Sequence, residues 1–153
     1  DVEMPEAFFR YQNKQNQSFN NYNNNNDNNN NEYNQNLKAR ALLIDMECGP
    51  LQETMKGPLG YLFDETQFVM DVYGSGNNFT HGHYIYGPKY RDSYEEGIRK
   101  NLEHCDAIQN FMITHSLGGG TGSGVGTYML KLLHDLHPKI CRYVNVWLVY
   151  VYI

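Results

Sequence analysis

The feature that constrains the fold of this chain most is a run of five glycines within nine residues, Ser116-Leu117-Gly118-Gly119-Gly120-Thr121-Gly122-Ser123-Gly124. It lies between a short apolar stretch at residues 111–114 and a segment in which apolar residues recur at intervals of three and four. This spacing places six side chains on one face of a helix: Val125, Tyr128, Met129, Leu132, Leu133 and Leu136. The glycine run is therefore predicted to form the turn between a buried strand and an amphipathic helix.

A turn of this kind is suited to binding an anion. The N-terminus of a helix presents unpaired N–H groups and the positive end of the helix dipole, and glycine lets the backbone approach a ligand closely. We predict that the backbone amides bind phosphate and that the hydroxyls of Thr121 and Ser123 are further donors. Two alternatives stay open: Thr121 only shapes the turn, or the run is a connector without a ligand. The predicted phosphate-binding residues of this loop are Ser116, Gly118, Gly119, Gly120, Thr121, Gly122 and Ser123.

The two commonest phosphate-binding motifs do not match this run. A P-loop requires Lys after its last glycine, but Val125 follows Gly124. The dinucleotide fingerprint, started from Gly118, requires its third glycine where Ser123 stands. Both mismatches weigh against an α/β enzyme that uses ATP or NAD, which remains an alternative.

The string Gly-Gly-Gly-Thr-Gly-Ser-Gly at residues 118–124 resembles the signature loop of the tubulin superfamily. Further blocks resemble that family in the same order and at similar intervals, and the resemblance covers roughly residues 37–147. Within the family, the sequence is most similar to the epsilon type. The blocks are residues 41–47, 74–79, 82–84 and 104–111. The second and third blocks together resemble one nucleotide loop of the family.

The order of the expected elements predicts an α/β fold with a doubly wound, mostly parallel sheet, as in a partial tubulin-type nucleotide-binding domain. Ligands bind such sheets beyond the carboxyl ends of the strands. Asp45, Asn77 and Gly118 each follow a strand-like run, so they are expected to converge on one edge. The expected elements are strands at residues 41–44, 68–72, 111–114 and 143–151, a helix capped by Ser93 and Glu96, and a helix that ends before Pro138.

The resemblance also assigns a second loop and a metal region. It implies that Ser75, Gly76 and Asn77 contribute to binding GTP phosphates, with Asn77 near the terminal phosphate. Asp45 and Glu47 stand two positions apart after a strand, and Mg²⁺ prefers such oxygen ligands. The resemblance favours Glu47 for the metal region and implies that it contacts the ion through water. The alternative for both acids is a solvated loop.

Composition excludes several classes of function. The net charge of −5 argues against nucleic-acid binding. The sequence has no apolar run long enough to cross a membrane. Three widely spaced cysteines indicate reduced thiols in the cytosol.

The sequence is expected to divide into three segments. Residues 1–11 resemble a loop of the nucleotide-binding domain, residues 12–36 form an Asn-rich disordered insertion, and residues 37–153 form a partial GTP-binding domain truncated at both ends. The apolar run at residues 146–153 departs from the family pattern.

The resemblance implies a GTP-binding, epsilon-like subunit of the microtubule cytoskeleton. Its expected location is the cytoplasm, at centrioles or basal bodies, and its expected partners are other tubulin subunits, bound head-to-tail through the nucleotide face. The family hydrolyses GTP, but its catalytic loop does not match any segment here, so no catalytic residue is named. A fragment that does not bind nucleotide by itself is the remaining alternative.

Overall fold

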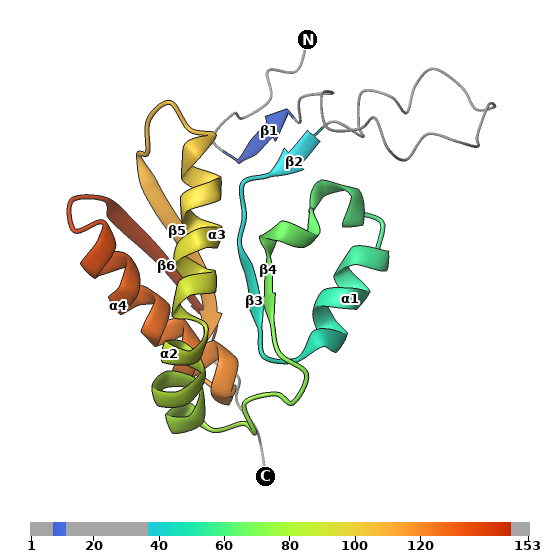
Figure 1. Ribbon diagram of the computed structural model, residues 1–153, viewed down its shortest axis with the longest axis vertical. Helices are drawn as coiled ribbons and strands as arrows, with labels where there is room; N and C mark the ends of the chain where they lie inside the picture. Colours follow the sequence, from blue (N-terminus) through green and yellow to red (C-terminus); the bar gives the residue numbers. More distant parts are fainter. Residues whose placement is uncertain (1–7, 12–36, 148–153) are drawn as a thin grey trace, which may run out of the picture.

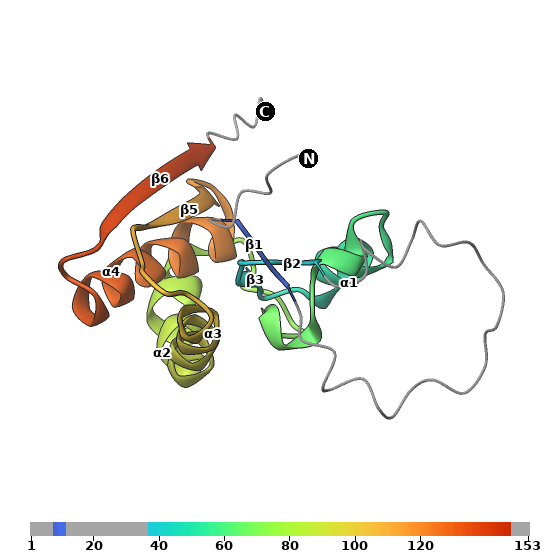
Figure 2. The same ribbon diagram turned by 90° about the horizontal axis from the view of Figure 1, so that it is seen from above.

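The computed structural model describes residues 8–11 and 37–147. The predicted insertion at residues 12–36 and the apolar end after residue 147 lie outside the described residues. Figures 1 and 2 show how the elements are arranged. In chain order they are β1 (Phe9–Tyr11), β2 (Leu37–Ala39), β3 (Leu43–Asp45), α1 (Cys48–Lys56), η3 (Gly60–Leu62), η4 (Glu65–Gln67), β4 (Phe68–Met70), η5 (His81–Tyr86), α2 (Gly87–Lys89), α3 (Arg91–Glu103), β5 (Asn110–Ser116), η6 (Gly119–Val125), α4 (Gly126–Leu136) and β6 (Cys141–Trp147).

The strands form three pairs. β1 and β2 are antiparallel, with Tyr11 opposite Leu37, so residues 12–36 connect two register partners. β3 pairs with β4, and β5 pairs with β6, both in parallel. Among the described residues no ladder joins β3 to β5. The two parallel pairs match the 3-2 and 4-5 portions of the doubly wound order 3-2-1-4-5-6, in which one further strand lies between them.

The helices α2, α3 and α4 lie on one side of the β5–β6 pair (Figure 2). A continuous core forms where α3 and α4 pack against the strands. Tyr94 of α3 is fully buried there, and desolvation raises the pKa of its hydroxyl. The buried members of this core are Met46, Val69, Tyr86, Tyr94, Ile98, Val125, Met129, Leu132 and Leu133.

The helix after the glycine run presents the predicted apolar face. Four of its six predicted residues are buried, and Tyr128 packs against the core. Leu136 was expected on the same face but is 37% exposed, and it is the last residue of the helix. The helix ends at Leu136, two residues before Pro138, as predicted.

The helix predicted to begin at a Ser93 cap begins earlier. α3 starts at Arg91, and η5 and α2 lead directly into it from His81. The amide of Tyr90 donates to the carbonyl of Tyr86 at 3.1 Å, and the amide of Tyr94 donates to Tyr90 at 3.0 Å. A capping box is not formed because helical turns precede this point and supply the acceptors. The prediction of a cap at Ser93 is therefore wrong.

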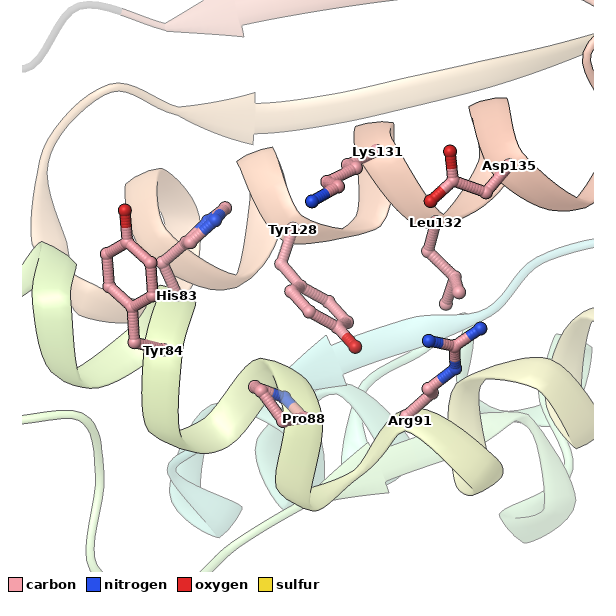
Figure 3. A pocket seen from close by; sticks show the side chains of 8 residues that line it. All are labelled: His83, Tyr84, Pro88, Arg91, Tyr128, Lys131, Leu132 and Asp135. Atoms are coloured by element: carbon pink, nitrogen blue, oxygen red, sulfur yellow. The ribbon is translucent and has the colours of Figure 1, made fainter.

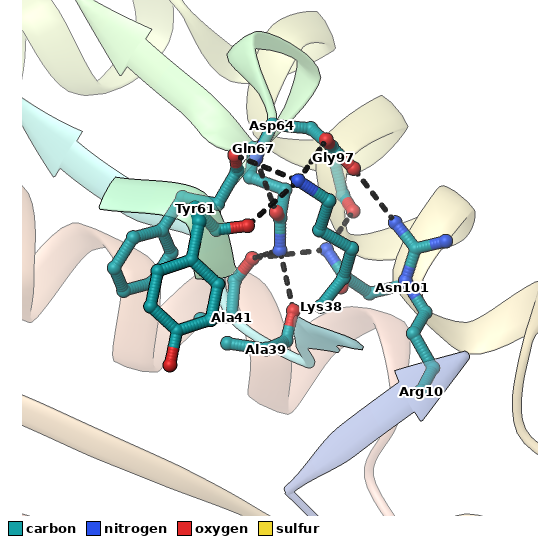
Figure 4. Close-up of polar contacts among 10 residues, drawn as sticks. Arg10, Lys38, Ala39, Ala41, Tyr61, Asp64, Gln67, Gly97 and Asn101 are labelled. Atoms are coloured by element: carbon teal, nitrogen blue, oxygen red, sulfur yellow. Dashed lines mark hydrogen bonds and ion pairs between the residues drawn. The ribbon is translucent and has the colours of Figure 1, made fainter. Parts of the chain in front are cut away.

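A buried glutamine joins the first strands to the rest of the fold (Figure 4). Gln67 is 2% exposed, and its Nε2 donates to the carbonyls of Ala39 at 2.6 Å and Ala41 at 2.9 Å. Its Oε1 accepts from the amide of Asp64 at 2.8 Å. Asp64 in turn pairs with Lys38 at 3.0 Å. The turn before β4 is thus fixed against the chain that leads into β3.

Candidate phosphate-binding site

Three loops meet at the hydroxyl of Thr121. Its Oγ1 donates to Oδ1 of Asp45 at 3.2 Å and accepts from the amide of Met46 at 3.3 Å. The Oγ of Ser75 lies 3.3 Å from the same atom. The loops that follow β3, β4 and β5 are therefore joined at one end of the strands (Figure 1). This is the convergence that the sequence predicted.

The first two glycines of the run leave space in front of the backbone. A Cβ atom added to Gly118 would meet nothing within 4 Å. Gly119 has a φ of +78°, a conformation that favours glycine, and an added Cβ would find only Oδ1 of Asn77, at 3.7 Å. The backbone here is accessible to a ligand that comes close to it.

The later glycines of the run have a different role. An added Cβ on Gly120 would clash with the side chain of Ser75, and one on Gly122 would clash with the side chain of Ser116. On Gly124 it would lie 2.5 Å from the carbonyl oxygen of Phe79. These glycines allow close packing of protein on protein. The glycine cluster predicts that other atoms approach the backbone closely. At these three positions the approaching atoms belong to the protein itself.

Gly120 and Gly124 also lie against η5, which sequence reasoning assigned to a nucleotide loop. Residues 82–84 instead lie in this helical segment. A Cβ on Gly82 would lie 2.8 Å from the carbonyl carbon of Gly120 and 3.1 Å from Cα of Gly124. Nδ1 of His83 lies 3.0 Å from Oγ1 of Thr127. Both η5 and η6 are π-helical, a rare conformation that occurs frequently at functional sites.

The loop after β4 is shaped by left-handed backbone conformations. Gly74, Gly76 and Asn77 have φ values of +69°, +60° and +52°. The amide of Gly74 donates to the carbonyl of Met46 at 2.8 Å, which holds this loop beside the one that follows β3. Oδ1 of Asn78 accepts from the amide of Thr80 at 2.8 Å, so this side chain caps the start of the helical segment.

Two predicted phosphate donors use their hydroxyls inside the loop in this structure. Ser116 donates to the carbonyl of Gly118 at 2.7 Å, and Ser123 donates to the carbonyl of Gly119. Ser123 is buried, whereas Ser116 is partly buried. Contact between either hydroxyl and a phosphate stays a prediction.

The two acids of the predicted metal region lie at the edge of the same site. Oδ1 of Asp45 also accepts from the amide of Glu47 at 3.2 Å. Glu47 is exposed, and its carboxylate lies next to Gly74, because a Cβ there would be 2.9 Å from Oε1. In the part of the chain that the structure describes, no three His, Cys, Asp or Glu side chains are grouped to hold a metal. One or two carboxylates beside phosphate oxygens and water fit the coordination of Mg²⁺.

Asp71 is a charged residue of this region that sequence reasoning did not assign. Its carboxylate is 7% exposed and accepts from Nζ of Lys89 and from the hydroxyl of Tyr90, each at 2.7 Å. These two hydrogen bonds, that from Lys89 first, hold the pKa of Asp71 well below its ordinary value. The signal available in the sequence was an acidic residue at the point where a strand passes into a loop. Its partners stand 18 and 19 positions later in the chain, so the sequence alone does not pair them with it.

A separate hollow of about 280 Å³ opens between η5, α2 and α4 (Figure 3). Tyr128 projects into it from α4, and Arg91 faces it from the start of α3 (Figure 3). None of the predicted phosphate-binding residues lines it. Its lining residues are His83, Tyr84, Pro88, Arg91, Tyr128, Lys131, Leu132 and Asp135.

Comparison with known proteins tests the predicted resemblance. Residues 3–150 match the profile of the Tubulin/FtsZ family, GTPase domain. Over 110 residues the chain is 52% identical to the tubulin epsilon chain of Homo sapiens and 51% identical to that of Mus musculus. These matches cover 72% of this chain and 23% of each relative. Over 106 residues it is 44% identical to the tubulin beta chain of Coprinopsis cinerea, across 68% of this chain and 24% of that relative.

The α/β fold and the loops at its edge are those of a GTPase domain, and the chain belongs to the Tubulin/FtsZ family. Within that family it is epsilon-like, since its identity to the two epsilon chains exceeds its identity to the beta chain. Both predictions of resemblance are confirmed, and an enzyme outside the family is excluded. The chain spans about a quarter of the length of these curated relatives.

None of the helices in residues 8–11 and 37–147 has both the length and the apolar character needed to cross a bilayer.

Proposed function

We propose that this chain binds GTP with Mg²⁺ and is the nucleotide-binding part of an epsilon-like tubulin subunit. The observation that carries the proposal is the convergence of three loops on Thr121, beside the accessible backbone of Gly118 and Gly119. Doubly wound folds bind ligands at this end of their parallel strands. The match to a GTPase domain supports GTP as the ligand.

In this proposal the glycine run and the loop after β4 bind the phosphates from two sides. The amides at Gly118 and Gly119 approach the phosphates directly, whereas the later glycines keep the loop in place. Asp45 and Glu47 hold Mg²⁺ together with water and phosphate oxygens, and the bound ion neutralises phosphate charge. No residue is assigned as a catalytic base.

The proposal also states how the parent subunit assembles and where in the cell it lies. We infer that the parent subunit contacts other tubulin subunits head-to-tail through its nucleotide face, in the cytoplasmic cytoskeleton at centrioles or basal bodies. The support is the similarity to proteins that are named tubulin epsilon chain. Imaging a tagged protein in ciliated cells tests this, and a diffuse signal without a centriolar focus would contradict it.

The test of nucleotide binding is the variant Gly118→Val in the 153-residue chain. The Cβ of the new side chain meets no protein atom within 4 Å, and the side chain occupies the region where phosphate is proposed to bind. We expect the affinity for Mg²⁺–GTP to fall by at least about tenfold, which corresponds to about 1.4 kcal/mol. Calorimetry with GTP, and with ATP for comparison, measures the effect.

Gly49→Ala is the matched control, because an added Cβ there also meets nothing within 4 Å. It should bind GTP as the wild type does, and both variants should keep the wild-type circular dichroism spectrum. Equal affinity of Gly118→Val and wild type would refute the proposed cradle. A folded wild-type chain without saturable GTP binding would instead favour the alternative of a fragment that does not bind by itself.

A further inference from the structure

The segment between β4 and the loop at residues 74–78 has little packing of its own. Val72 is 72% exposed and Tyr73 is 90% exposed. The position of this segment therefore depends on hydrogen bonds. One is the bond from the amide of Gly74 to the carbonyl of Met46, at the far end of the segment.

At the near end, the side chain of Asp71 makes the connection. Its Oδ1 accepts from the amides of Val72 and Tyr73, so the carboxylate organises the backbone that follows it. Its Oδ2 accepts from Lys89 and Tyr90 at 2.7 Å each. The backbone amide of Asp71 donates to the carbonyl of Asp45 at 3.3 Å. One residue thus joins the loop, the end of β3 and the turn between α2 and α3.

The cation that faces Asp71 is itself oriented by aromatic rings. Nζ of Lys89 lies 5.2 Å from the ring centroid of Tyr86 and 4.9 Å from that of Tyr90. The two rings are stacked, with an interplanar angle of 7°. Cation–π attraction therefore restricts the ammonium group to the side where Asp71 lies. The lysine side chain is 53% exposed, so it can be replaced without opening the core.

We propose that Asp71, Lys89 and Tyr90 form a clasp that positions the loop at residues 74–78 for phosphate binding. The clasp does not touch the nucleotide. It acts through the backbone, because the loop places Ser75 on Thr121 and Asn77 beside Gly119. This inference rests on the proposed function, since it concerns the same site.

The test combines Lys89→Met, Asp71→Asn and Lys89→Arg in the 153-residue chain. Lys89→Met keeps the length of the side chain and removes its charge. We expect it to weaken Mg²⁺–GTP binding by about three- to tenfold, as the loss of one charge-assisted hydrogen bond would. Asp71→Asn should weaken binding at least as much, and Lys89→Arg should restore most of the affinity.

Hydrogen exchange provides a measurement that general destabilisation would not reproduce. In Lys89→Met, amides of residues 72–78 should exchange several-fold faster without nucleotide, whereas those of α4 should be unchanged. Arg99→Met is the matched control, because it removes the exposed pairs with Glu96 and Glu103 on α3. This control should leave both affinity and loop exchange at wild-type values.

The outcomes separate the two proposals. If the wild type binds GTP and the clasp variants bind it equally well, the clasp is refuted and the proposed function stands. If exchange rises equally in the loop and in α4, the residues have a general structural role and the clasp is also refuted. A folded wild type that does not bind GTP refutes both.

Discussion

The carboxylate of Asp71 is almost fully buried at the end of β4, and its charge depends on two neighbours. Lys89 and then Tyr90 lower its pKa in the folded chain, whereas the unfolded chain has the ordinary value of about 3.9. A group with a lowered pKa contributes stability at pH values above its unfolded pKa. That contribution is lost as the pH falls below about 4 toward the folded pKa.

We therefore expect Asp71→Asn to reduce the acid dependence of stability. The wild type should lose part of its thermal stability between about pH 4 and pH 2, and the variant should lose less over that range. Lys89, whose pKa is raised by Asp71, remains protonated throughout and does not contribute to the slope. Midpoints of thermal unfolding at pH 7, 5, 4, 3 and 2 measure this, and parallel curves for the two proteins would contradict it.

At the scale of elements, the contact between η5 and η6 determines the shape of the glycine run. Gly82, Gly120 and Gly124 bring the two backbones closer than side chains would allow. Nδ1 of His83 adds a polar contact to the carbonyl of Gly124 at 3.2 Å. The glycine run is therefore supported by an element that sequence reasoning assigned to the candidate site itself.

The variant Gly82→Ala tests this packing. Its Cβ would clash with the carbonyl of Gly120, so the two elements would have to move apart. We expect a loss of about 1–3 kcal/mol in the free energy of unfolding, the usual cost of overpacking. Urea denaturation measures it, with Gly49→Ala as the control that adds the same methyl group in free space. Equal midpoints for the two variants would show that the contact is not tight.

At the scale of the whole molecule, the β5–β6 pair has one covered face and one exposed face. Phe111 and Ile113 of β5 pack on the core beneath the helices, whereas Met112 is 59% exposed. Its register partner Tyr143 is 61% exposed. Helices α3 and α4 lie on the other side (Figure 2). Contiguous exposed apolar surface of this kind promotes association.

We expect the isolated 153-residue chain to self-associate through this face. The double variant Met112→Glu with Tyr143→Lys places opposite charges on register partners and should shift the chain toward monomer. Sedimentation velocity over a range of concentrations measures the change. Leu59→Lys, at a position 58% exposed elsewhere, is the control and should associate as the wild type does. The same mass for all three proteins would contradict the expectation.

Much of the fold could be predicted because it depends on local patterns. The apolar period after Gly124 predicts α4, and the apolar runs ending at Asp45 and at Thr114 predict β3 and β5. The glycine string and its neighbouring blocks identify the family. Helix α1 and the helical segment from His81 were not predicted, because Gly, Pro and His interrupt their apolar patterns.

The sequence by itself therefore determined the order of most elements, the family and the loops that form the candidate site. Only the tertiary structure decided which glycines face free space and which pack against η5. It also decided that Thr121 meets Asp45, 76 positions away, and that Asp71 meets Lys89. The physical reason is the distance along the chain over which each effect acts. The spacing of apolar residues and the turn preferences of residues act over a few neighbouring positions. The space around a Cβ atom and the pairing of charges depend on segments that only folding brings together.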